Sequence, residues 1–164
     1  MPAPNALPSA TEVRLEPLTP ADLAGFWSTR IQPWVYDFDY LGHLTAAVYP
    51  KAFEQGRVEY FRERWAVDMP RYVVAHHQMH YMKEIKEQDG KQISVLIRPV
   101  EVGESSIRLE ELLLDAHERI ANISTVTLVA WDIDKRGSRR LDDHERSALD
   151  TDLARLGGLT SRTV

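Results

Sequence analysis

The strongest constraint on the fold is one long helix-like segment that precedes a run of strand-like segments. Between Leu44 and Arg64, apolar and small residues recur at helical spacing, so one face of this segment suits burial. Four strand-like segments separated by turn-like sequences follow it, at residues 72–85, 92–100, 105–117 and 119–132. Because helices and strands do not alternate, this order predicts an α+β fold in which an antiparallel sheet packs against one helix.

Two residues inside the helix-like segment are unusual for a helix. Pro50 lacks an N–H and would clash with a preceding turn, so the helix is expected to begin just before it, near residues 45–47. Gly56 costs about 1 kcal/mol of helix propensity relative to alanine. It lies on the same face as Tyr49, Phe53 and Tyr60. Its lack of a side chain would let the sheet approach the helix closely.

The residues before the helix predict a first strand. Residues 26–39 are rich in aromatic and β-branched side chains, which favour strands. Pro33 cannot donate a hydrogen bond to a neighbouring strand, so this strand is expected to lie at an edge of the sheet or to bulge there. The first strand and the four later segments would give a sheet of about five strands.

The length of the chain favours one domain. A single domain is predicted over residues 25–156. It follows a proline-rich leader with a short helix, residues 1–24, and precedes a flexible tail, residues 157–164. Asp142 or Asp143 is expected to cap a short helix at the end of the domain.

Composition and charge argue against several classes of protein. The 164-residue chain has no cysteine, which excludes disulfides and thiolate metal sites. Its formal net charge is -5, with 20 basic and 25 acidic residues mixed along the chain, so neither nucleic acid nor an anionic membrane is an expected partner. No apolar stretch is long enough to span a bilayer, and the N-terminal residues show no signal-peptide pattern. We therefore expect a cytoplasmic protein.

Two aspartates, a glycine and a histidine lie at the junction between the first strand and the helix: Asp37, Asp39, Gly42 and His43. Along a strand the two carboxylates would face the same way, and the glycine would allow a tight bend. The helix would then offer free N–H groups around residues 46–48. Such donors stabilise a developing oxyanion, and a nearby carboxylate can act as nucleophile or general base. The alternative is that both aspartates only cap turns at the positive end of the helix.

The junction resembles the hotdog-fold acyl-CoA thioesterases related to 4-hydroxybenzoyl-CoA thioesterase. The family pattern D-x-D-x-x-G-H-x-N-N-x-x-Y, followed by F-E-x-A-R-x-E-Y, corresponds here to DFDYLGHLTAAVY and FEQGRVEYF. The resemblance implies an α+β hotdog fold, an antiparallel sheet of about five strands wrapped around one long central helix. It also implies a homodimer or homotetramer with active sites between subunits.

The resemblance also gives roles to individual residues. It implies that Asp39 attacks the thioester or activates water, and that the backbone N–H of Ala46 is the oxyanion donor. His43 and Thr45 are candidate helpers, and Gly42 is expected at the substrate. The sequence departs from the pattern where the paired asparagines are replaced by Thr45 and Ala46.

Substrate contacts are expected from two further parts of the chain. Tyr49, in the first turn of the helix, matches the tyrosine of the family pattern. Arg136 and Arg139 lie in a basic loop that could meet the phosphates of coenzyme A. The alternative for this loop is a solvated turn.

These observations lead to one main prediction and two alternatives. The main prediction is a thioester hydrolase that splits acyl-CoA, or an acyl group on a carrier protein, into a carboxylic acid and a thiol. This chemistry requires no metal or redox cofactor. The first alternative, motivated by the missing asparagines, is a hotdog protein that binds acyl thioesters or scaffolds an assembly without turnover. The second is an acyl-thioester dehydratase or hydratase, which would release no thiol.

Three other features have a functional and a structural interpretation. His76 and His80 would share one face of a strand and His77 the other, so two imidazoles could bind zinc, but no third ligand has a suitable spacing. Glu54 is either a second carboxylate of the site or a salt-bridge partner of Arg57. Aromatic side chains near the junction or on the helix, which could line an acyl pocket or belong to the core, are Trp34, Tyr36 and Trp65.

Overall fold

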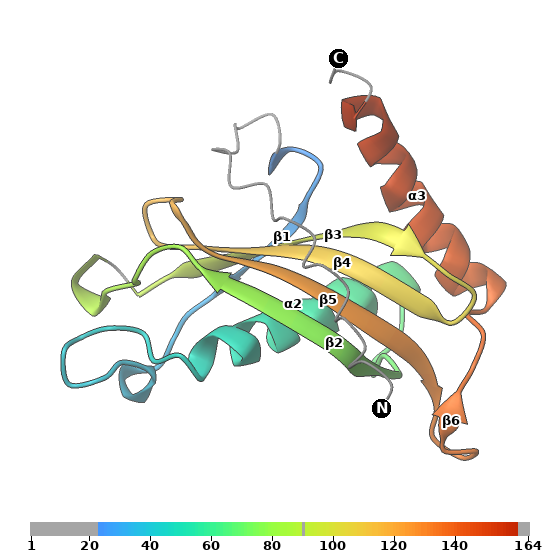
Figure 1. Ribbon diagram of the computed structural model, residues 1–164, viewed down its shortest axis with the longest axis horizontal. Coiled ribbons are helices and arrows are strands. Elements are labelled where there is room, and N and C mark those ends of the chain that lie inside the picture. Colours follow the sequence, from blue (N-terminus) through green and yellow to red (C-terminus); the bar gives the residue numbers. More distant parts are fainter. Residues whose placement is uncertain (1–22, 90, 161–164) are drawn as a thin grey trace, which may run out of the picture.

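Five strands form one curved antiparallel sheet that wraps over a long helix, α2 (Figure 1). The computed structural model describes residues 23–89 and 91–160, with side chains to Arg155. In chain order the strands are β1 (Trp27–Ile31), β2 (Tyr72–Tyr81), β3 (Ile93–Val102), β4 (Ser106–Leu114) and β5 (Ile120–Asp132). Their order in the sheet is β1-β3-β4-β5-β2, and a short strand, β6 (Gly137–Ser138), pairs with the end of β5.

The central helix α2 (Val48–Trp65) packs most closely on β3 and β1, and its aromatic side chains extend toward β2. The face predicted to be apolar is the face that is buried, including Tyr49, Phe53 and Tyr60. One long helix enclosed by one antiparallel sheet is the hotdog fold, so both the α+β class and the hotdog fold are confirmed.

The first strand ends earlier than predicted. β1 stops at Ile31, two residues before Pro33, because proline cannot continue the hydrogen-bonded ladder. Its place at the edge of the sheet was predicted correctly. A 3-10 turn, η1 (Val35–Asp37), follows, so Asp37 and Asp39 do not lie on a strand. The prediction that the two carboxylates face the same way along a strand was therefore wrong.

Two boundaries around the helix also differ from the prediction. Leu44 does not belong to α2 but forms a β-bridge with Phe38, and the helix begins at Val48. β2 ends at Tyr81 rather than at residue 85, because the N–H groups of Met82 and Lys83 both donate to one carbonyl oxygen of β5. The chain then turns through a short 3-10 segment, η2 (Glu87–Asp89), before β3.

The C-terminal helix α3 (Asp143–Thr160) is longer than the sequence predicts. Asp142 is its cap, since Asp142 Oδ1 accepts the N–H of Glu145 at 2.8 Å and Glu145 Oε2 accepts the N–H of Asp142 at 3.0 Å. The helix continues through Thr160, four residues into the predicted tail. Residues 161–164, and nearly all of the predicted leader with its short helix, lie outside the described residues.

Within the described residues, every helix is too short or too polar to cross a membrane.

The core between α2 and the sheet is a single cluster of buried side chains, which includes Phe53, Phe61, Ile97 and Leu128.

Gly56 marks the closest approach of α2 to the sheet. A Cβ atom at this position would lie 2.6 Å from Val95 Cγ1 and 3.2 Å from Val95 Cβ. Both distances are shorter than ordinary van der Waals contact, so a side chain would force the helix and β3 apart. The prediction that the glycine allows close packing is confirmed.

We expect Gly56→Ala to lower the free energy of unfolding by about 1–3 kcal/mol, because overpacking a close contact outweighs the gain in helix propensity. Chemical denaturation followed by tryptophan fluorescence measures this change. Gln55→Ala, at the exposed neighbouring position, is the matched control and should leave stability within about 0.5 kcal/mol. A Gly56→Ala variant as stable as the control would contradict the close contact.

Candidate active site

Residues 37–45 form a tight loop at the N-terminal end of α2. The N–H of Thr45 donates to the carbonyl of Asp37 at 2.9 Å, and the N–H of Asp39 donates to the carbonyl of His43 at 2.8 Å. Gly42 has φ +76, the left-handed conformation that glycine adopts without strain. The loop therefore holds Asp39 in a defined position immediately before the helix.

The carboxylate of Asp39 is fixed through one oxygen only. Asp39 Oδ1 accepts the backbone N–H groups of Leu41 at 2.8 Å and His43 at 2.9 Å. The other oxygen makes no hydrogen bond within the described residues, and the residue is half-buried. The arrangement orients the carboxylate and leaves one oxygen for a water molecule or a substrate.

Asp37 has a different environment. Its Oδ2 accepts the N–H of Trp34 at 2.8 Å, which closes the 3-10 turn, and its Oδ1 lies 3.5 Å from Lys51 Nζ. Of the two aspartates, Asp37 is therefore the one that caps a turn, and Asp39 is the one with an oxygen that no described residue contacts by a hydrogen bond.

The start of α2 supplies backbone donors. Ala46 and Ala47 are exposed, and their N–H groups have no acceptor within the described part of the chain. The N–H of Val48 donates to the carbonyl of Thr45 at 3.0 Å, so it is not free as predicted. Together with the helix dipole, the two remaining N–H groups can stabilise negative charge on a carbonyl oxygen.

Two other side chains predicted at this site differ in exposure: His43 is half-buried, and Tyr49 is buried. His43 Nε2 lies 3.3 Å from Glu84 Oε2, so the imidazole is turned toward the connection between β2 and β3. A hydrogen bond from Lys86 lowers the pKa of Glu84. Tyr49 is buried, its ring centroid lies 5.0 Å from that of Tyr81, and burial raises its pKa.

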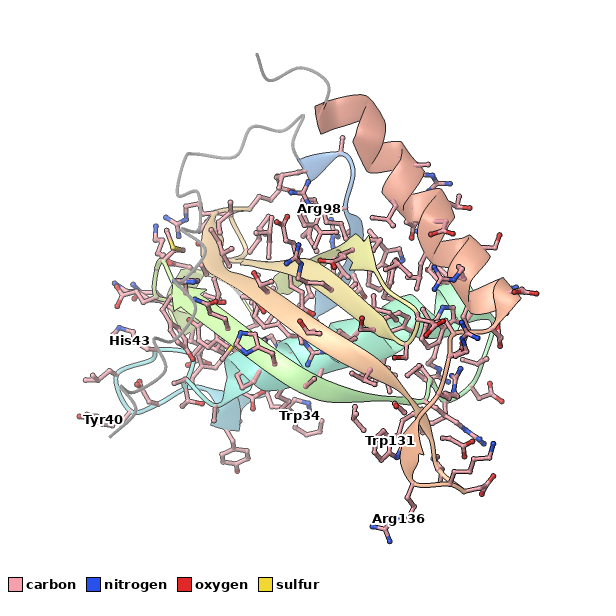
Figure 2. All side chains as sticks on the ribbon, turned by 45° about the vertical axis from the view of Figure 1, so that its right-hand side comes forward. Trp34, Tyr40, His43, Arg98, Trp131 and Arg136 are labelled. Carbon is pink, nitrogen blue, oxygen red and sulfur yellow. The ribbon has the colours of Figure 1, made fainter. Side chains whose placement is uncertain are left out.

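The two arginines predicted to bind coenzyme A are far from this loop. Figure 2 shows Tyr40 and His43 at one end of the molecule and Arg136 at the other. The guanidinium of Arg139 is already held by Glu145, with contacts of 2.6 and 2.7 Å. One protomer therefore brings together residues 39–49 but not Arg136 and Arg139, whose contact with the phosphates stays a prediction.

The exposed aromatic side chains near the loop are Trp34, Tyr36 and Tyr40, at 74%, 90% and 95% exposure. Trp65 is 2% exposed at the opposite end of α2, so it belongs to the core rather than to an acyl pocket beside Asp39. Two of the three aromatic residues singled out in the sequence thus remain near the site.

A family model decides what kind of protein has this fold and this loop. The model, described as the thioesterase-like superfamily, matches residues 33–155, which include the loop, α2 and all strands after β1. The chain belongs to the thioesterase-like superfamily. The resemblance noted in the sequence is thereby confirmed.

Solved structures similar to this superfamily member include several thioesterases. One from Thermus thermophilus, in complex with coenzyme A and Zn, is 27% identical with a TM-score of 0.67, and the match covers 79% of this chain and 95% of that one. A predicted thioesterase from Bacillus stearothermophilus is 21% identical, with a TM-score of 0.70 and coverage of 78% and 96%. DHNA-CoA thioesterase from Staphylococcus aureus is 15% identical, with a TM-score of 0.68 and coverage of 85% and 97%. No curated protein matches the chain.

This thioesterase-like chain also has a buried polar network that the sequence analysis missed. Arg57 Nη1 lies 3.0 Å from both carboxylate oxygens of Glu111. Ser124 Oγ donates to Glu111 Oε2 at 2.9 Å and lies 2.8 Å from His77 Nε2. Burial raises the pKa of Glu111 to about 7, against the opposing effects of Arg57 and Ser124.

Strand alternation could have revealed this network. Glu111 has the same parity on β4 as the core residues Leu109 and Leu113, and Ser124 has the same parity on β5 as Val126. A polar residue at a core-facing position must find a partner. Asn122, two residues before Ser124, is a further polar residue on the same face.

Glu54 fits its structural interpretation, and the three histidines lie on the faces of β2 that the sequence predicts. Glu54 Oε2 lies 2.7 Å from Arg57 Nη2, as the salt-bridge alternative predicts. His77 faces α2, with its ring centroid 6.1 Å from that of Phe53, whereas His76 and His80 lie on the opposite face of β2. Among the residues that can be described, no three histidine, aspartate or glutamate side chains are grouped as a metal site.

The buried position of Glu111 predicts a pH dependence of stability. Its pKa is about 7 in the folded protein and 4.5 in a model peptide, so between these values the folded protein holds more protons than the unfolded chain. The contribution of Glu111 to the free energy of unfolding is therefore greatest below pH 4.5, and this contribution is lost as the pH rises through about 7. Denaturant unfolding between pH 4 and about 8 measures the trend.

The control for this trend is Glu111→Gln, which retains an acceptor for Arg57 but cannot titrate. Burial lowers the pKa of the neighbouring His77, which gives the opposite slope in both proteins, so the difference between them isolates Glu111. The wild-type protein should lose stability relative to the variant as the pH rises. Parallel pH curves would show that Glu111 does not change its protonation state over this range.

Proposed function

We propose that this protein hydrolyses acyl-CoA thioesters to a carboxylic acid and a free thiol. The observation that carries the proposal is Asp39, in the loop that leads into α2: its carboxylate is fixed by two backbone N–H groups and keeps one oxygen without a partner among the described residues. Membership of the thioesterase-like superfamily supports the reaction class. Coenzyme A as the thiol is supported by the complex of the similar Thermus thermophilus thioesterase.

The geometry suggests how the reaction would proceed. The carbonyl oxygen of the thioester accepts the N–H of Ala46, and the adjacent Ala47 N–H lies at the same helix end. The free oxygen of Asp39 either attacks the carbonyl carbon or removes a proton from a water molecule that attacks it. If water attacks, the C–S bond breaks and the acyl group leaves directly as a carboxylic acid. If Asp39 attacks, the C–S bond breaks to leave an anhydride between Asp39 and the acyl group, and a water molecule then hydrolyses this anhydride to release the acid and restore Asp39. In both routes the thiolate leaves and takes up a proton. A backbone donor is unaffected by the replacement of asparagine with alanine at position 46.

We further propose that the working form is a homo-oligomer. Among the described residues β2 is an edge strand, paired on one side only, and Val73 and Val74 on it are 37% and 45% exposed. Exposed apolar residues beside an open edge favour association with another copy. Because Arg136 lies far from Tyr40, the chain neighbour of Asp39, in one protomer (Figure 2), joint contact of Arg136 and Asp39 with one substrate would require a second copy.

Sedimentation equilibrium tests the assembly. We expect a dimer or tetramer for the wild-type protein, and dissociation toward monomer when Val74→Lys places a charge on the β2 edge. Arg108→Lys, on an exposed position of the interior strand β4, is the control. A monomeric wild-type protein at micromolar concentration would contradict the proposed oligomer.

The reaction is tested by thiol release from short, long and aromatic acyl-CoAs, measured with a thiol-reactive dye. Since the protein has no cysteine, it contributes no background. Release that depends on Asp39 supports the hydrolase. Release from acyl-carrier-protein but not from acyl-CoA would overturn the choice of coenzyme A. Tight binding of acyl-CoA without release of thiol would instead favour a non-catalytic binding protein.

A further inference from the structure

Asn122 is an isolated polar side chain in the core. It is 0% exposed, and neither its Nδ2 nor its Oδ1 has a hydrogen-bond partner within the described residues. A carboxamide offers two donors and an acceptor, and leaving such a group unpaired in the interior costs about 1–3 kcal/mol. Leucine has the same branched shape and number of side-chain heavy atoms, although its methyl groups are larger, and it would avoid this cost, so stability alone does not account for an asparagine here.

The position of Asn122 connects it to the candidate active site. On β5 it is directly opposite Tyr81 of β2 and Leu113 of β4. The hydroxyl of Tyr81 lies 3.4 Å from the carbonyl oxygen of Ala46, and its ring packs edge-on against Tyr49. Tyr81 is therefore both the cross-strand partner of Asn122 and a contact of Ala46, the residue whose N–H is the proposed oxyanion donor.

Two polar groups next to Asn122 along β5 are already engaged. Ser124 is hydrogen-bonded to Glu111 and lies within hydrogen-bond distance of His77. The carbonyl of Ala121 accepts two backbone N–H groups from the chain after β2. The carboxamide thus has donors and an acceptor to offer, and its immediate protein neighbours do not use them.

Tyr81 provides a route to this group. It lies on the edge strand, its side chain is 54% exposed, and its hydrogen bond to Ala46 is long and therefore weak. Because Tyr81 contacts Ala46 and is the cross-strand partner of Asn122, a change of its rotamer is the movement by which the proposal would open a way from the α2 N-terminus to the carboxamide. An acyl group with its carbonyl at the Ala46 N–H would then lead past Tyr49 toward the carboxamide.

We propose that Asn122 recognises a polar atom, a hydroxyl or carbonyl oxygen, carried on the acyl group of the thioester. This inference rests on the proposed function, because it takes the thioester carbonyl to lie at Ala46. A substrate with such an atom would satisfy the buried carboxamide, and one without it would leave the carboxamide unpaired. Sites of this kind discriminate far more strongly than apolar pockets do.

The experiment compares matched pairs of substrates that differ by one hydroxyl. The pairs are 4-hydroxyphenylacetyl-CoA with phenylacetyl-CoA, and 6-hydroxyhexanoyl-CoA with hexanoyl-CoA. We expect the wild-type protein to prefer the hydroxylated member of at least one pair by about tenfold or more in kcat/KM. Asn122→Leu should remove the preference by lowering kcat/KM for the hydroxylated member.

Two controls keep the result interpretable. Thr125→Val changes a residue on the opposite face of the same strand and should leave the preference intact. Asn122→Ser provides a smaller polar replacement in case the leucine variant does not fold, and it should weaken the preference. If a folded Asn122 variant keeps the wild-type ratio within about twofold, the carboxamide has only a structural role and the proposal is overturned.

A binding measurement separates this proposal from the proposed function. Non-hydrolysable analogues of the same pairs, with a methylene between carbonyl and sulfur, are tested by the rise in Tm that they cause. A hydroxyl preference that Asn122→Leu removes, without thiol release by the wild-type protein, would support the Asn122 subsite and reject hydrolysis. Thiol release without any hydroxyl preference would support hydrolysis and reject the subsite.

Discussion

Asp39→Asn is expected to lower kcat for thiol release by about 10²–10⁴-fold, because an amide can neither attack the carbonyl carbon nor accept a proton from water. The amide oxygen can still accept the N–H groups of Leu41 and His43, which now hold the carboxylate at 2.8 and 2.9 Å. The loop should therefore keep its shape, and KM should change by no more than about threefold. Steady-state kinetics with the best acyl-CoA of the panel measures both constants.

Asp37→Asn is the matched control for this prediction. Its side chain would still accept the N–H of Trp34, and it would lose only the weak interaction with Lys51 at 3.5 Å. We expect its kcat to remain within a few-fold of the wild-type value. Full activity of the Asp39 variant would rule out a chemical role for Asp39, and an equal loss in both variants would show that the loop needs both charges.

Arg57→Met is expected to lower the free energy of unfolding by about 3–5 kcal/mol, the largest effect on stability that the structure predicts. The guanidinium is 2% exposed and contacts the carboxylate of Glu111, which is 0% exposed, at 3.0 Å. Removing it takes away the hydrogen bonds to both Glu111 oxygens and the partner of Glu54, and the buried Glu111 must then either stay charged without a cation or take up a proton. Denaturation in urea, monitored by circular dichroism, measures the loss.

Two variants test the cause of that loss. Arg108→Met removes an arginine that pairs with Glu101 at 3.1 Å, where both side chains are at least half exposed, so it should cost no more than about 1 kcal/mol. In the double variant Arg57→Met with Glu111→Gln, no buried charge is left unpaired, and most of the lost stability should return. A double variant as unstable as the single one would assign the effect to packing of the arginine stem instead.

The sequence predicted the fold well because its signals are local and repeated. Helical spacing before Trp65 and strand alternation after it set the α+β class. Pro50 predicted where α2 begins, and Gly56 predicted the close contact of α2 with the sheet, which is made with β3. The error at Asp37 arose where aromatic, strand-like residues continued past Pro33, and the loss of one backbone donor there outweighed their propensity.

The candidate site was predictable only in part. The motif located the loop from Asp39 to Ala46, but it did not show that Asp37 caps a turn or that Val48 has its N–H engaged. The network of Arg57 with Glu111 joins residues 54 positions apart, and no local pattern specifies such a pairing. Whether a buried Asn122 finds a partner likewise depends on tertiary neighbours that sequence spacing does not give.

The order of strands has a consequence for biosynthesis. β2 pairs with β5, and the partner of His76 in that pairing is Thr127. Thr127 leaves the ribosome about 50 residues after His76, which takes several seconds at the usual speed of translation. During this interval a nascent segment containing Val73 and Val74 has no strand beside it and is open to pairing with other emerging chains. The yield of correctly folded protein should therefore respond to expression temperature and translation rate more than the stability of the finished domain would suggest.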